Sequence, residues 1–162
     1  MDAFVEWLRA TPLSQAIVYR IWIWPLCETL HFIGLALVIG IAGFFDLRLM
    51  GFFKQISIDD ARELMPLAVI GFLLNLTTGV IFFIGHPEQY AHNPAWWWKF
   101  GFLCLAGLNA LIFQLSVGRQ TVGLRGGADT SMAVKTIGAV SLISWFAVLY
   151  FGRMLPFLGS AF

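Results

Sequence analysis

Four long apolar runs decide what this chain can fold into. They cover about residues 26–47, 64–84, 95–117 and 133–155. Each run is long enough to cross the hydrocarbon of a bilayer, which takes roughly 20 helical residues. Open strands would leave backbone groups unpaired in hydrocarbon, and no run shows the alternation of a barrel strand. The sequence therefore predicts an all-α, polytopic integral membrane four-helix bundle, with residues 1–162 as a single membrane domain.

The composition excludes the main alternatives to a membrane protein. The chain is 59% hydrophobic and 12% charged, whereas an ordinary soluble domain is about 45–50% apolar and about 25% charged. Such a chain has too much apolar surface for a soluble enzyme or a disordered protein. A net charge of +1 also lacks the basic footprint of a nucleic-acid binder. Membrane lipids are therefore its first expected partner.

Residues 1–24 have a different character from the four runs, because they mix charged side chains with scattered apolar ones. Thr11 followed by Pro12 is typical of an N-cap and a first helical position. We interpret the segment as one or two amphipathic helices lying along the membrane surface. A second start signal, Ser57 followed by acidic residues, indicates a helix that begins ahead of the second run.

The distribution of basic residues predicts the orientation of the four spans. Six basic residues fall on the side that holds the first and third connections between spans, and four fall on the other side. Cytoplasmic loops carry the excess of Lys and Arg, so both termini are expected to face outward. The run Trp96, Trp97 and Trp98 lies on this outer side, where Trp is enriched in the headgroup region.

His31 is the most informative polar residue, because an ionisable side chain inside a span costs several kcal/mol. Glu28 and Gly34 lie on the same helical face. This pattern suits a ligand of a flat cofactor: the glycine makes room for a macrocycle, and the other ring nitrogen needs a partner. The alternative is a histidine hydrogen-bonded to a neighbouring helix, with Gly34 present for close packing.

Three other residues are expected near His31, on the outer side of the membrane. Lys99 begins the third span at a comparable depth, and His86 ends the second span. Either could ligate a metal together with His31, although a lysine near the interface also snorkels. Arg153 is placed to meet lipid headgroups or the propionates of a cofactor. At the opposite end, Asp46 and Arg48 are expected to snorkel or to pair with neighbours.

The two cysteines allow a different metal site. Cys27 and Cys104 both fall inside predicted spans, where buried thiols are common. A site built from these two residues and His31 would suit Cu(I), because soft sulfur ligands favour that ion.

Two segments carry a family resemblance that covers most of the chain. They read WPLCETLHFIGLALVIGIAGFFDLRLMG and NPAWWWKFGFLCLAGLNALIF. The chain resembles a bacterial family of small four-helix membrane proteins. It is more distantly similar to the copper-resistance D-type proteins and to the HemJ-type protoporphyrinogen oxidase. In the latter, a first-helix histidine and a third-helix lysine are associated with haem b; the resemblance maps them onto His31 and Lys99. It also implies a location in the bacterial inner membrane, with both termini periplasmic.

These observations together favour one function and leave two alternatives. The preferred hypothesis is a haem b-binding bundle that transfers electrons at the periplasmic side, to or from a quinone or a partner subunit. Whether the protein is an enzyme is left open. The alternatives are an accessory subunit of a larger membrane complex and a copper-handling protein. A second copy of the chain is a further candidate partner.

Overall fold

The computed structural model describes residues 1–158, which are mostly helical. Helices account for 80% of it, and these residues contain no strand. The elements run in the order α1 (Asp2–Arg9), α2 (Pro12–Tyr19), α3 (Ile23–Leu37), η1 (Val38–Ala42), α4 (Gly43–Leu49), α5 (Ile58–Glu63), α6 (Met65–Gly85), α7 (Pro87–Ala91), α8 (Pro94–Ile112), η2 (Phe113–Val117), η3 (Gly118–Thr121) and α9 (Met132–Leu158).

Four helical segments are long and apolar enough to cross a membrane, as the sequence predicts. They are Ile23–Leu49, Ile58–Gly85, Pro94–Thr121 and Met132–Met154. Most of these bounds extend beyond the predicted ones, since a helix continues past its apolar run to the residue that caps it. The first segment joins α3, the π-helical turn η1 and α4 into one continuous rod.

Both helix starts expected from the sequence are confirmed. The Thr11 hydroxyl accepts a hydrogen bond from the backbone N–H of Ser14 at 3.2 Å, and Pro12 is the first residue of α2. The Ser57 hydroxyl accepts from the N–H of Asp60 at 3.0 Å. Each cap satisfies one of the backbone donors that a helix N-terminus leaves free.

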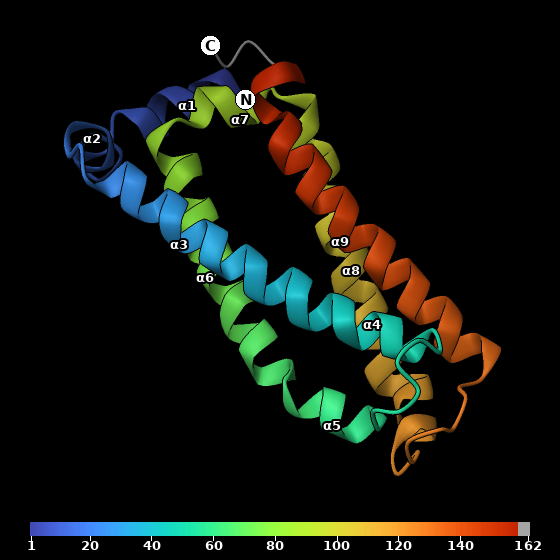
Figure 1. The fold of residues 1–162 in the computed structure, drawn as a ribbon. Helices are drawn as coiled ribbons and strands as arrows, with labels where there is room; N and C mark the ends of the chain where they lie inside the picture. Colours follow the sequence, from blue (N-terminus) through green and yellow to red (C-terminus); the bar gives the residue numbers. More distant parts are fainter. Residues whose placement is uncertain (159–162) are drawn as a thin grey trace.

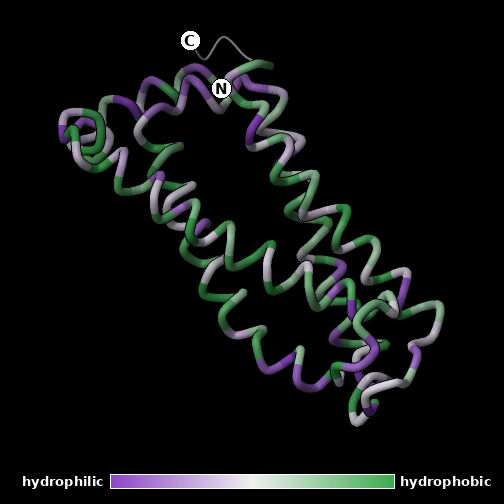
Figure 2. The backbone as a smooth tube through the Cα atoms, in the orientation of Figure 1, coloured by the Kyte–Doolittle hydropathy of each residue, from purple (hydrophilic) through white to green (hydrophobic). Residues whose placement is uncertain are grey.

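The long helices form two pairs that meet at one end and diverge towards the other (Figure 1). The rod of α3 and α4 packs on α6, and α8 packs on α9; the pairs join mainly where α4 crosses α9. We call the end that holds α1, α2 and α7 the α7 end, and the opposite one the α5 end. Hydrophobic residues predominate between the two ends, and hydrophilic residues gather at both (Figure 2).

Two glycines allow α3 and α6 to approach closely. A Cβ atom built on Gly71 would lie 2.7 Å from Cβ of Leu37 and 2.8 Å from the carbonyl oxygen of Gly34. A Cβ on Gly34 would lie 2.7 Å from the carbonyl oxygen of Gly71. Real side chains do not fit at such distances. Small residues at membrane helix interfaces serve this purpose, because they let two backbones come together.

A similar close contact joins the two pairs near the α5 end. A Cβ on Gly138 of α9 would lie 2.8 Å from the carbonyl oxygen of Asp46 in α4. Beside this crossing lies the main buried apolar cluster, which includes Phe45, Leu49, Phe113 and Val134. This cluster takes side chains from both pairs, so the α5 end holds the bundle together.

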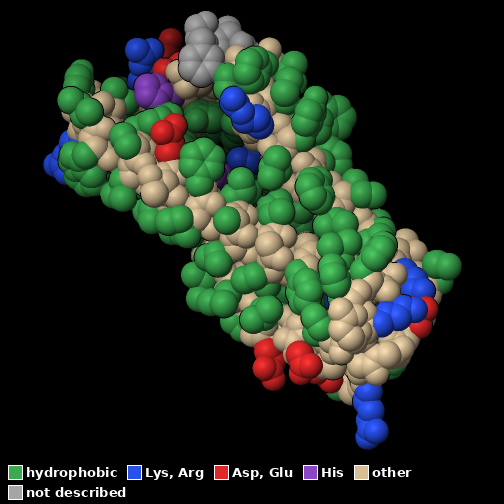
Figure 3. Space-filling model, in the orientation of Figure 1, with side chains coloured by type: hydrophobic (Ala, Val, Ile, Leu, Met, Phe, Trp, Pro, Cys, Tyr) green, Lys and Arg blue, Asp and Glu red, His purple; other side chains and the backbone are tan. Residues whose placement is uncertain are grey.

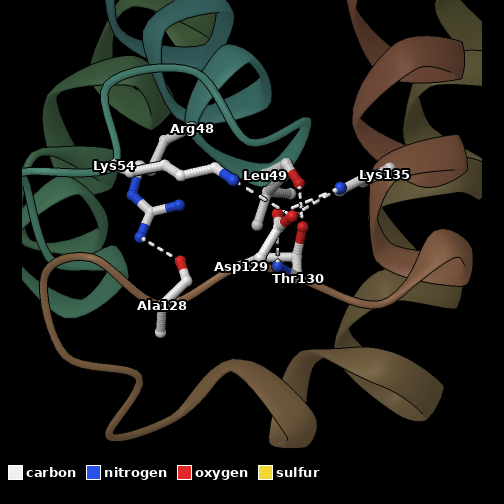
Figure 4. A network of polar contacts seen from close by, with 7 residues as sticks. All are labelled: Arg48, Leu49, Lys54, Ala128, Asp129, Thr130 and Lys135. Atoms are coloured by element: carbon white, nitrogen blue, oxygen red, sulfur yellow. Dashed lines mark hydrogen bonds and ion pairs between the residues drawn. The ribbon is translucent and has the colours of Figure 1, made fainter.

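Arg48 and Asp46 do not snorkel, contrary to one expectation from the sequence. The Arg48 side chain is fully buried. Its Nε donates to the carbonyl oxygen of Ile56 at 2.6 Å. One terminal nitrogen donates to the carbonyl oxygen of Ala128 at 3.2 Å (Figure 4), and the other has no partner within residues 1–158. Two connections fold over the end of α4 and supply these carbonyls, which replace part of the water that the guanidinium loses.

Asp129 fastens the same connection to its surroundings (Figure 4). Its carboxylate lies 3.0 Å from Nζ of Lys54 and 3.0 Å from Nζ of Lys135, and it accepts from the N–H of Thr130 at 2.9 Å. Hydrogen bonds from Lys135 and then from Lys54 hold the pKa of the Asp129 carboxyl well below its usual range. A carboxylate with a lowered pKa stabilises the fold above its unfolded pKa, and this contribution is lost as the pH falls.

The Gly34–Gly71 contact can be tested with two matched glycines of α6. Gly71→Ala is expected to destabilise the protein by about 1–3 kcal/mol, the usual effect of overpacking a tight contact. Gly79→Ala adds the same methyl group to the same helix where nothing lies within 4 Å. It should be neutral or stabilising by up to about 1 kcal/mol. Unfolding measured in detergent would decide, and equal stabilities for both variants would contradict the contact.

The Asp129 network predicts a pH-dependent loop. The hydrogen-exchange protection factors of residues 126–131 should be high at neutral pH and fall several-fold as the pH falls below about 4, the ordinary carboxyl range. Asp129→Asn should show the low protection factors at neutral pH already. Asp60→Asn is the control, because Asp60 is exposed and forms no ion pair within residues 1–158.

Candidate functional site

His31 lies on the face of α3 that packs against α6, and a threonine of α6 fixes its ring. Nδ1 of His31 is 2.7 Å from the hydroxyl oxygen of Thr78. The single hydroxyl proton of Thr78 goes to the carbonyl of Leu74 at 2.8 Å or of Asn75 at 3.2 Å. The hydroxyl oxygen therefore accepts from His31, which assigns the ring proton to Nδ1. This tautomer leaves the lone pair of Nε2 free.

Asn75 fixes the backbone of the same residue. With its amide nitrogen turned towards α3, Asn75 donates to the carbonyl oxygen of His31 at 2.6 Å, and its oxygen accepts from the N–H of Leu35 at 3.0 Å. The amide thus bridges one backbone donor and one acceptor of α3. Together, Asn75 and Thr78 hold both the backbone and the ring of His31 from one side.

Lys99 belongs to the other helix pair. Its side chain starts on α8 and lies against Gly152 of α9, with Nζ 3.6 Å from the position of a Cβ there. The surface is hollowed between α3 and α9 near the α7 end, with basic side chains at the rim and inside (Figure 3). His31 and Lys99 therefore lie on opposite helix pairs, and both are partly buried.

His86 is not brought into direct contact with His31. The rings form a chain in which His86 packs on Trp24 at 5.1 Å, Trp24 on Phe82 at 4.8 Å and Phe82 on His31 at 5.6 Å. Nδ1 of His86 also lies 3.7 Å from a carboxylate oxygen of Glu88. Two aromatic rings thus link the histidines, and His86 sits at the rim of the bundle beside α2.

The other charged candidates lie around the α7 end. The Glu28 carboxylate is exposed and accepts a hydrogen bond from Nε1 of Trp24 at 3.1 Å. Burial of Tyr90 of α7, with a smaller electrostatic effect of Glu28, raises the pKa of Tyr90 to about 12. Arg153 is exposed, and its guanidinium carbon lies 5.5 Å from the ring centre of Phe157.

Gly34 packs against α6 and does not border an open space that could hold a macrocycle. Its open side faces the backbone of Gly71 and the side chain of Asn75. Close helix packing therefore explains this glycine, and it leaves no space for a ring at that position. The partner of the His31 ring also differs from the flanking carboxylate, since Thr78 holds Nδ1 while Glu28 is bonded to Trp24.

The cysteines do not gather into a metal site with His31. Cys27 is buried, whereas Cys104 is exposed on α8. Within residues 1–158, no group of three or more His, Cys, Asp or Glu side chains is arranged to hold a metal ion.

Comparison with family models, with curated proteins and with solved structures found no match.

The tautomer of His31 is open to direct measurement. The 15N shifts of its ring should show a protonated Nδ1 and an unprotonated Nε2 in the wild type. Thr78→Val removes the acceptor, so the two tautomers should mix, with a stability loss of about 1–3 kcal/mol for the unsatisfied donor. Thr77→Val is the matched control, since Thr77 is exposed and bonds only within its own helix at 2.9 Å. A protonated Nε2 in the wild type would contradict the assignment.

Proposed function

We propose that this protein binds haem b between its two helix pairs near the α7 end and transfers electrons there. The α7 end faces the periplasm, in a bacterial inner membrane. His31 would bind the haem iron, and Lys99 of the other helix pair would supply a second nitrogen ligand or pair with a propionate. The electron partner is a quinone or a subunit of a larger membrane complex.

One observation carries the proposal: Nδ1 of His31 lies 2.7 Å from the hydroxyl oxygen of Thr78, and that hydroxyl has backbone carbonyls of α6 within hydrogen-bond distance for its own proton. A histidine that ligates a metal almost always donates its other ring N–H to a fixed partner, which sets the tautomer and the ring orientation. A hydroxyl that already donates to its own helix is such a partner. Nε2 has no hydrogen bond within residues 1–158, so its lone pair is available.

Lys99 supports the proposal because its amine lies in the same region without an anionic partner. No ion pair involving Lys99 is found in the described part of the chain. An amine that has lost its proton is a nitrogen ligand, and a protonated amine pairs with a carboxylate such as a propionate. Lys99 is a better second ligand than His86, which two rings separate from His31.

Haem b supplies a one-electron couple of its iron when it is bound. The chain's own residues do the rest. Thr78 orients the imidazole, and Phe82 covers one side of it. Near the α7 end, Arg153 is exposed and would pair with a propionate. Glu28 is exposed there as well, whereas Tyr90 is largely buried.

The membrane placement is part of the same proposal. Helices α1 and α2 carry large apolar side chains that stay exposed, including Phe4, Trp7 and Leu13. A bilayer surface would cover them, as it covers the apolar face of interfacial helices. The indole rings of Trp97 and Trp98 are also exposed near this end, which fits an interfacial belt.

The test is the visible spectrum of the protein purified after expression with ample haem. We expect a Soret band and a positive pyridine haemochrome assay. His31→Ala should abolish the band, and Lys99→Ala should change its position and spin state. Thr78→Val should weaken haem affinity about 10- to 100-fold, the usual effect of losing the partner of a ligating histidine.

The third histidine provides the control. His92 is exposed in a loop and lies 3.0 Å from Asp2, so His92→Ala should leave the spectrum unchanged. A protein without a Soret band, copurified with a large partner, would support the accessory-subunit alternative instead. Bound copper that is lost in Cys27→Ser would support copper handling, because ligation of haem by His31 does not need that thiol.

A further inference from the structure

A cavity lies inside the bundle, nearer the α5 end. Its volume is about 370 Å³, within the range of about 300–1,000 Å³ that small-molecule sites occupy. Residues from α4, α6, α8 and α9 line it. Most of the walls are apolar, and four aromatic rings contribute to them: Phe45, Phe72, Phe113 and Trp145.

The cavity is distinct from the region around His31. Phe72 of α6 and Trp145 of α9 meet across the interior, with ring centres 6.4 Å apart. Both residues line the cavity on the side nearer the α7 end. Along the rod, the lining residue nearest to His31 is Val38, seven residues or about 10 Å away at 1.5 Å per residue, and Asp46 lies about 22 Å away.

A buried carboxyl group lines this cavity. Asp46 is 5% exposed, and within residues 1–158 its Oδ2 is buried without a hydrogen-bond partner. Asn109 of α8, which also lines the cavity, uses its amide nitrogen on the carbonyl of Ile137 at 3.1 Å. The remaining polar lining residues are Arg62, Gln114 and Ser141. A buried polar group without a partner is costly, and a ligand bound at the Asp46 carboxyl group would offset that cost.

The cavity opens towards lipid between α6 and α8. These two helices pack on other partners and hardly touch each other along this stretch. The residues that line the gap are small or exposed, namely Val69 on α6 with Gly107 and Ala110 on α8. A ligand that enters here comes from the bilayer and must itself be apolar.

We propose that this cavity binds a membrane-soluble quinone or quinol, with a ring oxygen at the Asp46 carboxyl group and the apolar tail leaving between α6 and α8. A carboxyl group accepts from a quinol hydroxyl when ionised and donates to a quinone carbonyl when protonated, so it pairs with either form. The aromatic walls suit a flat ring. A lipid acyl chain would fill the space but offer no hydrogen bond to the Asp46 carboxyl group.

A redox role for the bound quinone rests on the proposed haem function, but quinone binding itself needs no haem. The experiment therefore uses haem-free protein in nanodiscs and a photoreactive azido derivative of decylubiquinone. Labelled peptides should come from residues 65–72 and 103–114. Unlabelled decylubiquinone should compete, and Asp46→Leu should weaken that competition about tenfold, as expected for one lost hydrogen bond to a carboxyl group.

Two further variants keep the test decisive. Glu63→Leu removes an exposed carboxylate outside the cavity and should leave the labelling unchanged. Gly107→Trp fills the gap without touching Asp46, at a glycine with nothing within 4 Å, and should abolish it. Equal competition in the wild type and Asp46→Leu would overturn the proposal. So would full displacement by dodecane or by dodecylamine, which would identify an acyl-chain or an amine site. Because no haem is present, failure here leaves the haem proposal untouched, and the reverse also holds.

Discussion

The close contact between α3 and α6 is the constraint on which the region around His31 depends. Gly34 and Gly71 have no side chains, so the two backbones come together there. Only at that separation can the short side chains of Asn75 and Thr78 reach across, one to the backbone and one to the ring of His31. The contact between Gly34 and Gly71 therefore lets Thr78, two turns further along α6, set the tautomer of His31 on α3.

The two helix pairs are held together unevenly, and this asymmetry shapes the interior. At the α5 end, Gly138 admits the backbone of α4, and buried Arg48 ties two connections over it. Towards the α7 end the pairs diverge (Figure 1). The rings of Phe72 and Trp145 meet between the two regions. The bundle thus has a hollowed surface near the α7 end (Figure 3) and a cavity with a carboxyl group nearer the α5 end.

The sequence predicted the helices well because hydropathy and capping are local properties. The four runs and the caps at Thr11 and Ser57 need no knowledge of the neighbours. The sequence also marked His31 and Lys99 as polar residues in apolar spans. It did not identify Thr78 as the partner of the ring, although two adjacent threonines in an apolar run were a usable signal. The partner depends on how α6 is rotated against α3, which one chain does not reveal.

Polar residues near span ends were harder to interpret for the same reason. Asp46 and Arg48 lie close to a predicted boundary, where snorkelling is the ordinary outcome. The folded connections prevent it, because they cover the end of α4 and supply carbonyls to the guanidinium. Neither side chain is completely satisfied, since one terminal nitrogen of Arg48 and Oδ2 of Asp46 have no hydrogen-bond partner within residues 1–158. What separates the two residues is their surroundings: backbone carbonyls of two connections hold the Arg48 guanidinium, whereas Asp46 lines an apolar cavity large enough for a ligand.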